Sequence, residues 1–120
     1  MPDIQSTNFD LEKRTTTFAV RVVKLCRSVE KDSINNRITG QLVGSAGSVG
    51  ANYREANDSL GKKDFLQRLK ISRKEAKEAM HWLELLKEAN LEGFGSEIEI
   101  CYKEASELKC ILSSIIKKCE

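Results

Sequence analysis

Several residue types that interrupt helices or carry chemistry are scarce in this chain of 120 residues. Proline occurs once, at Pro2, so nothing downstream of it breaks a long helix. Histidine also occurs once, at His81, which argues against catalytic or metal sites that require several histidines. No apolar run approaches the length of a membrane span, and the N-terminus has no signal-peptide core. We therefore expect a cytoplasmic protein with no membrane partner.

The chain also lacks a strong charge imbalance and any C-x-x-C pair. Its net charge of +2 is too small to indicate nucleic-acid binding by itself. The unpaired spacing of its cysteines predicts neither a zinc site nor a disulfide framework. We expect Cys101 and Cys119 to be buried as small apolar side chains, and Cys110 to be more exposed.

Helical periodicity is what the chain does contain. Hydrophobic residues make up 40% and charged residues 32%, which is typical of a globular domain. Apolar residues recur every three or four positions in four segments, and the alternation of apolar and polar residues that is typical of strands is absent. Short connections require consecutive helices to run antiparallel. The sequence predicts an all-α, antiparallel up-down-up-down four-helix bundle over residues 9–120, after a flexible tail of residues 1–8.

Local signals predict where the four helices begin and end. Asn8 or Asp10 is a candidate N-cap for a first helix that runs to about residue 31. Ser33 is the candidate cap of a second helix that ends near residue 57. The third helix is predicted over residues 62–89, with Gly93 as a left-handed C-terminal residue. Ser96 and Glu99 have the spacing of a capping box at the start of the fourth helix.

The second predicted helix contains four glycines within the stretch RITGQLVGSAGSVGANYREA. Each glycine inside a helix costs about 0.5–1 kcal/mol relative to alanine. The apolar residues of this helix share one face, and the opposite face is almost without side chains over an arc of about 60°. We call this face the glycine stripe: Gly40, Gly44, Gly47 and Ala51. It predicts a close helix contact, either inside one bundle or between subunits. Exposure of the stripe to solvent is the least expected alternative, because nothing would then offset the cost of the glycines.

The third predicted helix is apolar on two sides, with a main face from Phe65 to Leu83 and a second strip of Ile71, Trp82, Leu85 and Ala89. A helix of this kind needs packing partners on two sides. Between the two apolar sides lies a row of positive side chains, the basic band: Lys63, Lys70, Arg73, Lys74 and Lys77. The band could follow a phosphate backbone, or it could be a solvated face balanced by Glu84 and Glu88.

No catalytic or cofactor site is predicted. Glu78 and His81 match the Glu-x-x-His spacing of di-iron bundles, but such a site needs two motifs and two further glutamates. The chain has one histidine, so we expect no metal and no cofactor. No loop presents a nucleophile to His81, and the glycines lack the signature of a phosphate-binding loop. We expect a protein that is not an enzyme.

Two blocks of the sequence resemble a known family. Gln41 to Asn57, QLVGSAGSVGANYREAN, and Asp64 to Ala89, DFLQRLKISRKEAKEAMHWLELLKEA, closely resemble the bacterial four-helix-bundle proteins encoded in 23S ribosomal RNA intervening sequences. The resemblance covers nearly the whole chain. Many relatives carry arginine at the position of Gly44, so the second helix of this chain lacks a positive charge found there in the family.

The resemblance implies a four-helix bundle that forms ring-shaped homopentamers. It also implies binding to RNA or to a reverse transcriptase, by similarity to accessory proteins of diversity-generating retroelements. It supplies no catalytic residues. We hypothesise a homo-oligomer that binds structured RNA through basic helix faces. The alternative hypothesis is an oligomeric adaptor whose ligand is another protein.

Overall fold

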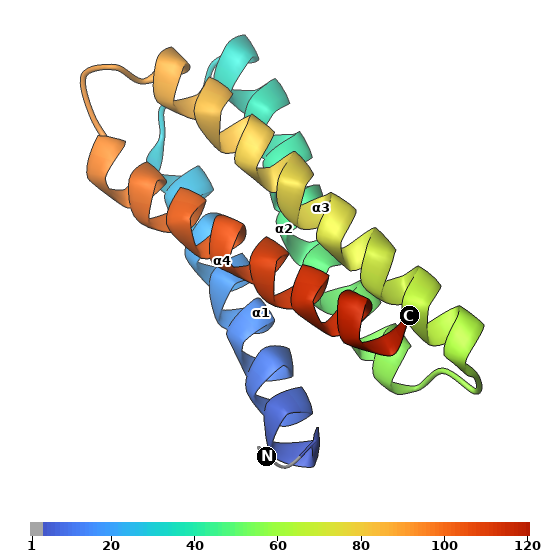
Figure 1. Cartoon of the computed structure of the whole chain (residues 1–120). Coiled ribbons are helices and arrows are strands. Elements are labelled where there is room, and N and C mark those ends of the chain that lie inside the picture. Colours follow the sequence, from blue (N-terminus) through green and yellow to red (C-terminus); the bar gives the residue numbers. More distant parts are fainter. Residues whose placement is uncertain (1–3) are drawn as a thin grey trace.

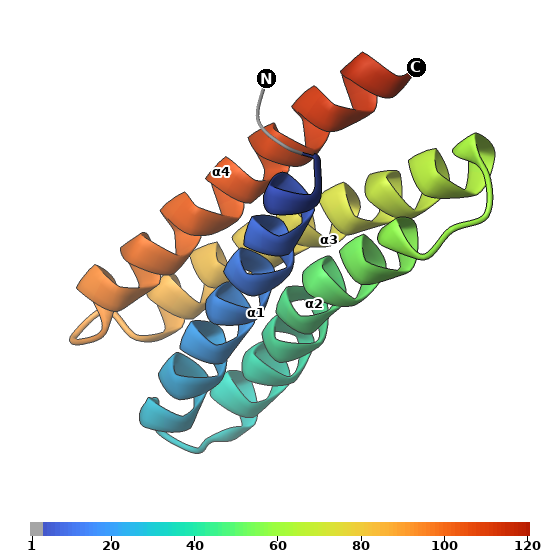
Figure 2. The same cartoon turned by 90° about the horizontal axis from the view of Figure 1, so that it is seen from below.

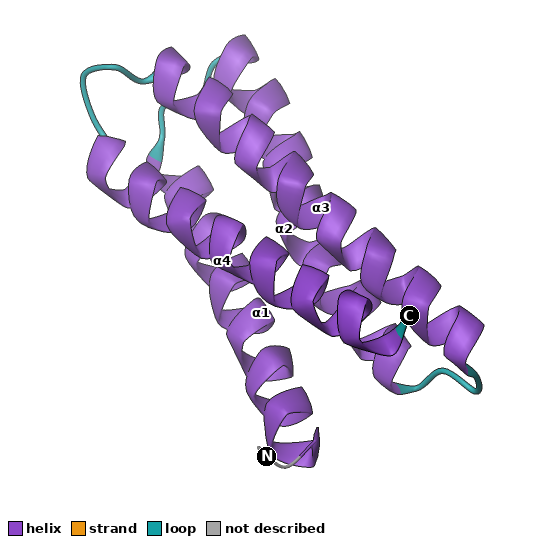
Figure 3. Cartoon of the chain, viewed as in Figure 1, coloured by secondary structure: helices purple, strands orange, loops and turns teal. Residues whose placement is uncertain are grey.

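The computed structural model describes the backbone of residues 4–120 and the side chains of residues 10–120. Four helices follow one another: α1 (Ile4–Ser28), α2 (Ser33–Asn57), α3 (Lys62–Ala89) and α4 (Gly95–Cys119). The described residues form no strand (Figure 3). The predicted all-α four-helix fold is confirmed.

Consecutive helices run in opposite directions and pack in the cyclic order α1, α2, α3, α4 (Figure 1). Side-chain contacts follow the same antiparallel pairing. The start of α2 meets the end of α3 where Asn35 and Asn90 exchange two amide hydrogen bonds of 3.0 and 2.9 Å. Seen from below, α1 and α3 occupy opposite sides of the bundle axis, and α1 is inclined to the other helices (Figure 2).

The start of α2 differs by one residue from the prediction. The carboxylate of Asp32 accepts a hydrogen bond of 2.7 Å from the backbone N–H of Asn35, so Asp32 is the N-cap. Ser33, the predicted cap, is the first helical residue. Both residues are good caps, and the sequence Asp-Ser leaves the choice between them to tertiary packing.

The first helix begins earlier than predicted, at Ile4, so residues 4–8 are helical and neither Asn8 nor Asp10 is its cap. Residues 1–3 of the predicted tail lie outside the described residues. No proline or glycine lies between residue 3 and the end of α1, so the helix has no reason to stop at a polar residue. The same helix ends at Ser28, about three residues before the predicted limit.

The connection between α3 and α4 corrects two further predictions. No described glycine has a positive φ, so Gly93 is not a left-handed cap. Phe94 takes that conformation instead, with φ of 68°, and it is the N-cap of α4 without a side-chain hydrogen bond. Ser96 lies inside the helix, so the Ser96–Glu99 capping box does not form.

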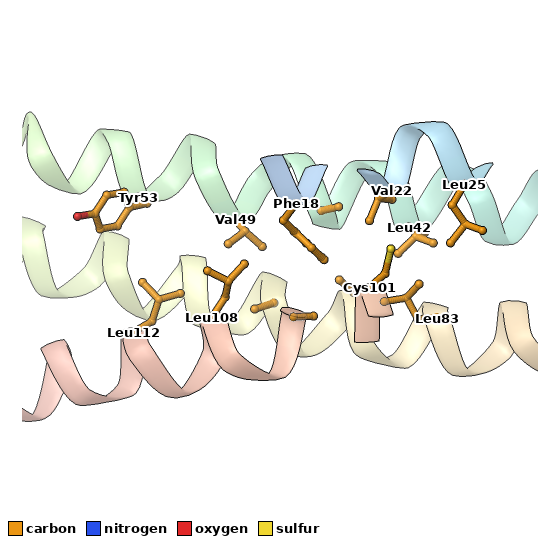
Figure 4. Close-up of a cluster of buried hydrophobic side chains, with 14 of the residues drawn as sticks. Phe18, Val22, Leu25, Leu42, Val49, Tyr53, Leu83, Cys101, Leu108 and Leu112 are labelled. Atoms are coloured by element: carbon orange, nitrogen blue, oxygen red, sulfur yellow. The ribbon is translucent and has the colours of Figure 1, made fainter. Parts of the chain in front are cut away.

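The core consists of the apolar face of each helix, directed to the bundle axis (Figure 4). The apolar faces of α1 and α2 are buried, and so are Leu69, Ala76 and Leu83 on the main face of α3, whereas Phe65 at the start of that face is half-buried. The hydroxyl of Ser72, which has no exposed surface, donates to the carbonyl oxygen of Val49 at 2.7 Å. This hydrogen bond satisfies the one polar residue on the main face of α3 and ties it closely to α2.

Glycine permits the closest approach between α1 and α2. A Cβ at Gly50 would lie 2.9 Å from Oγ1 and 3.2 Å from Cβ of the buried Thr15. Cys101 is buried and Cys110 is exposed, as expected, whereas Cys119, which was expected to be buried, is half-buried. Within residues 4–120, no helix combines the length and the apolar character needed to cross a membrane.

Candidate nucleic-acid interface

The basic band lies on the outer surface of α3, and four of its five members are exposed: Lys63, Lys70, Lys74 and Lys77. They are positioned by a helix whose opposite face is buried, at spacings of three, four and seven residues that return to the same side. Arg73 is the exception. It is half-buried and points to α4, where its guanidinium donates to Oγ of Ser113 at 3.5 Å.

Most lysines of the band have no acidic partner. Lys70 lies 4.0 Å from a carboxylate oxygen of Glu120, and both side chains are more than half exposed. No ion pair within 4.0 Å is formed by Lys63, Lys74 or Lys77 among the described residues. Glu84 and Glu88, the predicted balancing residues, form none either, and Glu84 instead accepts a hydrogen bond from the hydroxyl of Tyr102 at 3.1 Å.

The arginines of α1 are arranged differently. Arg14 donates to both carboxylate oxygens of Glu104 at 2.8 Å and also to Glu107, and Arg21 donates to Glu97 at 2.5 Å. The hydrogen bond from Arg21 lowers the pKa of the Glu97 carboxyl. These positive charges are occupied in holding α1 to α4, whereas the lysines of the basic band are free to meet a ligand.

Two half-buried apolar side chains, Leu66 and Ile71, lie beside the lysines and line a shallow surface hollow with them. The hollow is lined by Lys63, Leu66, Gln67, Lys70, Ile71 and Lys74, all from α3. A surface of this composition can accept phosphates on its lysines and the flat side of a sugar or base on its apolar side chains.

His81 does not assemble a site with Glu78. Its ring is exposed and meets Trp82 edge to face, with ring centroids 4.9 Å apart. Within the described part of the chain, no group of three or more His, Cys, Asp or Glu side chains could hold a metal ion. Glu78 instead lies close to Glu75, where burial and then the charge of Glu78 raise the pKa of the Glu75 carboxyl.

The glycine stripe is exposed along its whole length. A Cβ added at Gly40, Gly44 or Gly47 would meet nothing within 4 Å. The three glycines of the stripe therefore do not pack against another helix of the same chain, which removes the interpretation of a close contact inside one bundle and leaves contact between subunits or exposure to solvent.

Residues of α1 that were not predicted from the sequence lie next to the glycine stripe. Val20 and Val23 are 46% and 37% exposed, and with Gly47 and Ala51 they line a groove between α1 and α2. The signal was present in the sequence, because two valines three residues apart lie outside the apolar face of α1.

Comparisons with known proteins agree with this architecture. The family model for the 23S rRNA-intervening sequence protein matches residues 7–114. A crystal structure from Bacteroides thetaiotaomicron VPI-5482, of a protein with unknown function from the S23 ribosomal protein family, is 32% identical in sequence. The similarity covers 88% of this chain and 97% of that one, with a TM-score of 0.78. None of the curated proteins matches. Because the family model spans most of the chain, this four-helix bundle belongs to the 23S rRNA-intervening sequence protein family.

Proposed function

We propose that this protein is a non-enzymatic homo-oligomer that binds structured RNA through the basic band of α3. The observation that carries the proposal is the row of exposed lysines on one helix, three of which have no carboxylate within 4.0 Å. From Lys63 to Lys77 the band extends over about 21 Å of helix, which is enough to follow several phosphates of one strand. Binding of this kind depends on salt and little on sequence.

The oligomeric part of the proposal is supported by surface that one chain leaves uncovered. Val20, Val23 and Leu85 are each more than a third exposed, and the glycine stripe has no neighbour in the chain. Copies arranged symmetrically would repeat the basic band around the assembly. Several bands of modest charge then act together, which compensates for a net charge of only +2 per chain.

The proposal assigns no catalytic role to His81, Cys26 or Cys101. The ring of His81 lies against Trp82, and Cys26 and Cys101 are buried thiols whose pKa is raised by burial to about 11. A thiol protonated at neutral pH is a poor nucleophile.

Retention of RNA by the purified protein tests the proposal. We expect a stem-loop RNA to be retained at low salt and released as salt rises, with a log–log slope of about −0.7 to −0.9 for each neutralised phosphate. The substitutions K70E, K74E and K77E together should abolish retention, because each reverses an exposed charge without removing a buried contact.

The matched control reverses exposed lysines elsewhere, with K103E and K118E on α4. This control should retain RNA with a reduction of no more than a few fold. Undiminished retention by the α3 variant, or equal loss in both variants, would contradict a site on the basic band.

A second candidate function is an oligomeric adaptor for a protein such as a reverse transcriptase. The uncovered apolar surface on α1 and α2 favours it, because apolar surface suits a protein better than it suits a nucleic acid. A partner that remains bound after nuclease treatment and in high salt would support this function over RNA binding.

A further inference from the structure

The groove between α1 and α2 has an apolar floor and basic edges. Its floor is formed by small and branched side chains from both helices, among them Ala19, Val20, Val23, Gly47 and Ala51. Its edges carry Lys24, Arg27 and Arg54. We call it the valine groove. Arg54 has a carboxylate of Glu12 at 3.7 Å, whereas no ion pair within 4.0 Å is formed by Lys24 or Arg27 among the described residues.

A surface of opposite charge lies on α3. Glu75 and Glu78 follow one another at a spacing of three residues, between the half-buried Ile71 and Trp82, and Leu85 beyond them is 40% exposed. We call this surface the acidic strip. Neither carboxylate forms an ion pair within 4.0 Å in the described part of the chain, and after burial the neighbouring charge of Glu78 is the next cause of the raised pKa of Glu75. Like charges at this spacing repel, so a positive charge from outside would stabilise both.

The two surfaces match in length and in character. From Thr15 to Arg27 the groove extends over about 18 Å of helix, and from Ile71 to Leu85 the acidic strip extends over about 21 Å. The groove offers apolar side chains bordered by cations, and the strip offers apolar side chains interrupted by carboxylates. The cations of the groove and the carboxylates of the strip are therefore complementary in charge.

The two surfaces open on neighbouring sides of the bundle. Arg68 of α3 donates to Asn52 of α2 at 3.4 Å, and Ile71 and Glu75 follow Arg68 at helical spacings of three and seven, so they lie on the side toward α2. The groove lies on the other side of α2, against α1. When copies join head to tail through two neighbouring sides, each copy is rotated by the same angle relative to the copy before it. The row of copies therefore curves toward a closed ring.

We propose that the valine groove of one copy receives the acidic strip of α3 from the next copy. This inference rests on the proposed homo-oligomer and names the two surfaces that form its repeating contact. Lys24 and Arg27 pair with Glu75 and Glu78, while Trp82 and Leu85 cover Val20 and Val23. In the resulting curve α2 lies innermost, where the small residues of the glycine stripe let neighbouring copies approach without a clash.

Charge reversal on each surface tests the contact by molar mass in solution, with no RNA present. The double substitution K24E/R27E makes the groove acidic, and E75K/E78K makes the strip basic. Each variant alone should dissociate to 13.5 kDa, because equal charges then face each other. An equimolar mixture of the two should associate again, because every contact between the two kinds of copy pairs opposite charges.

The control K103E/K118E, on α4, should keep the mass of the unsubstituted protein. Helix content by circular dichroism verifies that each variant is folded. The neutral pairs K24Q/R27Q and E75Q/E78Q provide a second measurement, and each should associate at least tenfold more weakly than the unsubstituted protein. Full association of either reversed variant, or a mixture that stays monomeric, would overturn the contact. RNA retention is measured separately. If these substitutions do not change the oligomer, only the proposed contact is refuted, and the proposal of RNA binding is unaffected.

Discussion

At the scale of single residues, the glycines of α2 divide into two kinds. Gly50 faces α1, where the buried Thr15 leaves no room for a Cβ. Gly40 faces open space in the chain, although both glycines lie in the same helix and carry the same intrinsic cost. The sequence alone could not separate them, because the separation depends on which helix lies next to each residue.

Alanine substitutions at these two positions should have opposite effects on stability. Gly50→Ala should lower the free energy of unfolding by about 1–3 kcal/mol, because Thr15 is held by its own helix and cannot move aside. Gly40→Ala should raise it by about 0.5–1 kcal/mol through helix propensity. Urea denaturation of dilute protein measures both. Equal effects of the two substitutions would show that α1 does not approach α2 at Gly50.

The buried cysteines make the free energy of unfolding depend on pH in the alkaline range. Burial raises the pKa of Cys26 and Cys101 to about 11 from 9.0, and for Cys101 the carboxylate of Glu97 adds to the effect. Above pH 9 the unfolded thiols ionise while the folded ones stay protonated. The stability that these thiols contribute is therefore present below pH 9 and lost as the pH rises toward 11.

We expect the urea midpoint of the protein to fall between pH 8.5 and pH 10.5 more steeply than that of the variant C26A/C101A. The comparison removes the contributions of lysines and tyrosines, which titrate in both proteins. Identical pH profiles for the two proteins would mean that these thiols are not buried as the fold places them.

At the scale of helices, most of the architecture could be predicted, because apolar periodicity depends on burial alone. The limits of α3 and the end of α2 were correct, and so was the buried face of α1 and of α2, whereas Phe65 on the predicted main face of α3 is only half-buried. The caps were the errors. Asp32 and Ser33 have similar intrinsic preferences, and Phe94 takes a left-handed conformation that glycine at position 93 or 95 would adopt more easily.

The cap of α2 can be tested by a pair of neighbouring substitutions. Asp32→Ala should lower the free energy of unfolding by about 0.5–2 kcal/mol, because the N–H of Asn35 loses its acceptor. Ser33→Ala should change it by less than about 0.5 kcal/mol, since Ser33 is already helical and exposed. Thermal denaturation provides the measurement, and a larger loss for Ser33→Ala would contradict the assignment of the cap.

At the scale of the whole molecule, the candidate surfaces could be predicted in part. The basic band and the glycine stripe were recognised from helical spacing. The outward direction of the stripe could not be predicted. Helical periodicity shows that α2 has a second face, but it does not show whether that face contacts the same chain or another one. The two exposed valines of α1 could have been found from their spacing, but the valine groove itself could not, because residues of two helices line it.

The molar mass of the unsubstituted protein in dilute buffer, free of nucleic acid, tests the central claim most directly. The claim is that the surfaces left open on α1, α2 and α3 are covered by further copies of the chain. Light scattering at micromolar concentration should give an integer multiple of 13.5 kDa greater than one. A single folded species of 13.5 kDa would contradict the claim, because the glycine stripe and the valine groove would then be open to water.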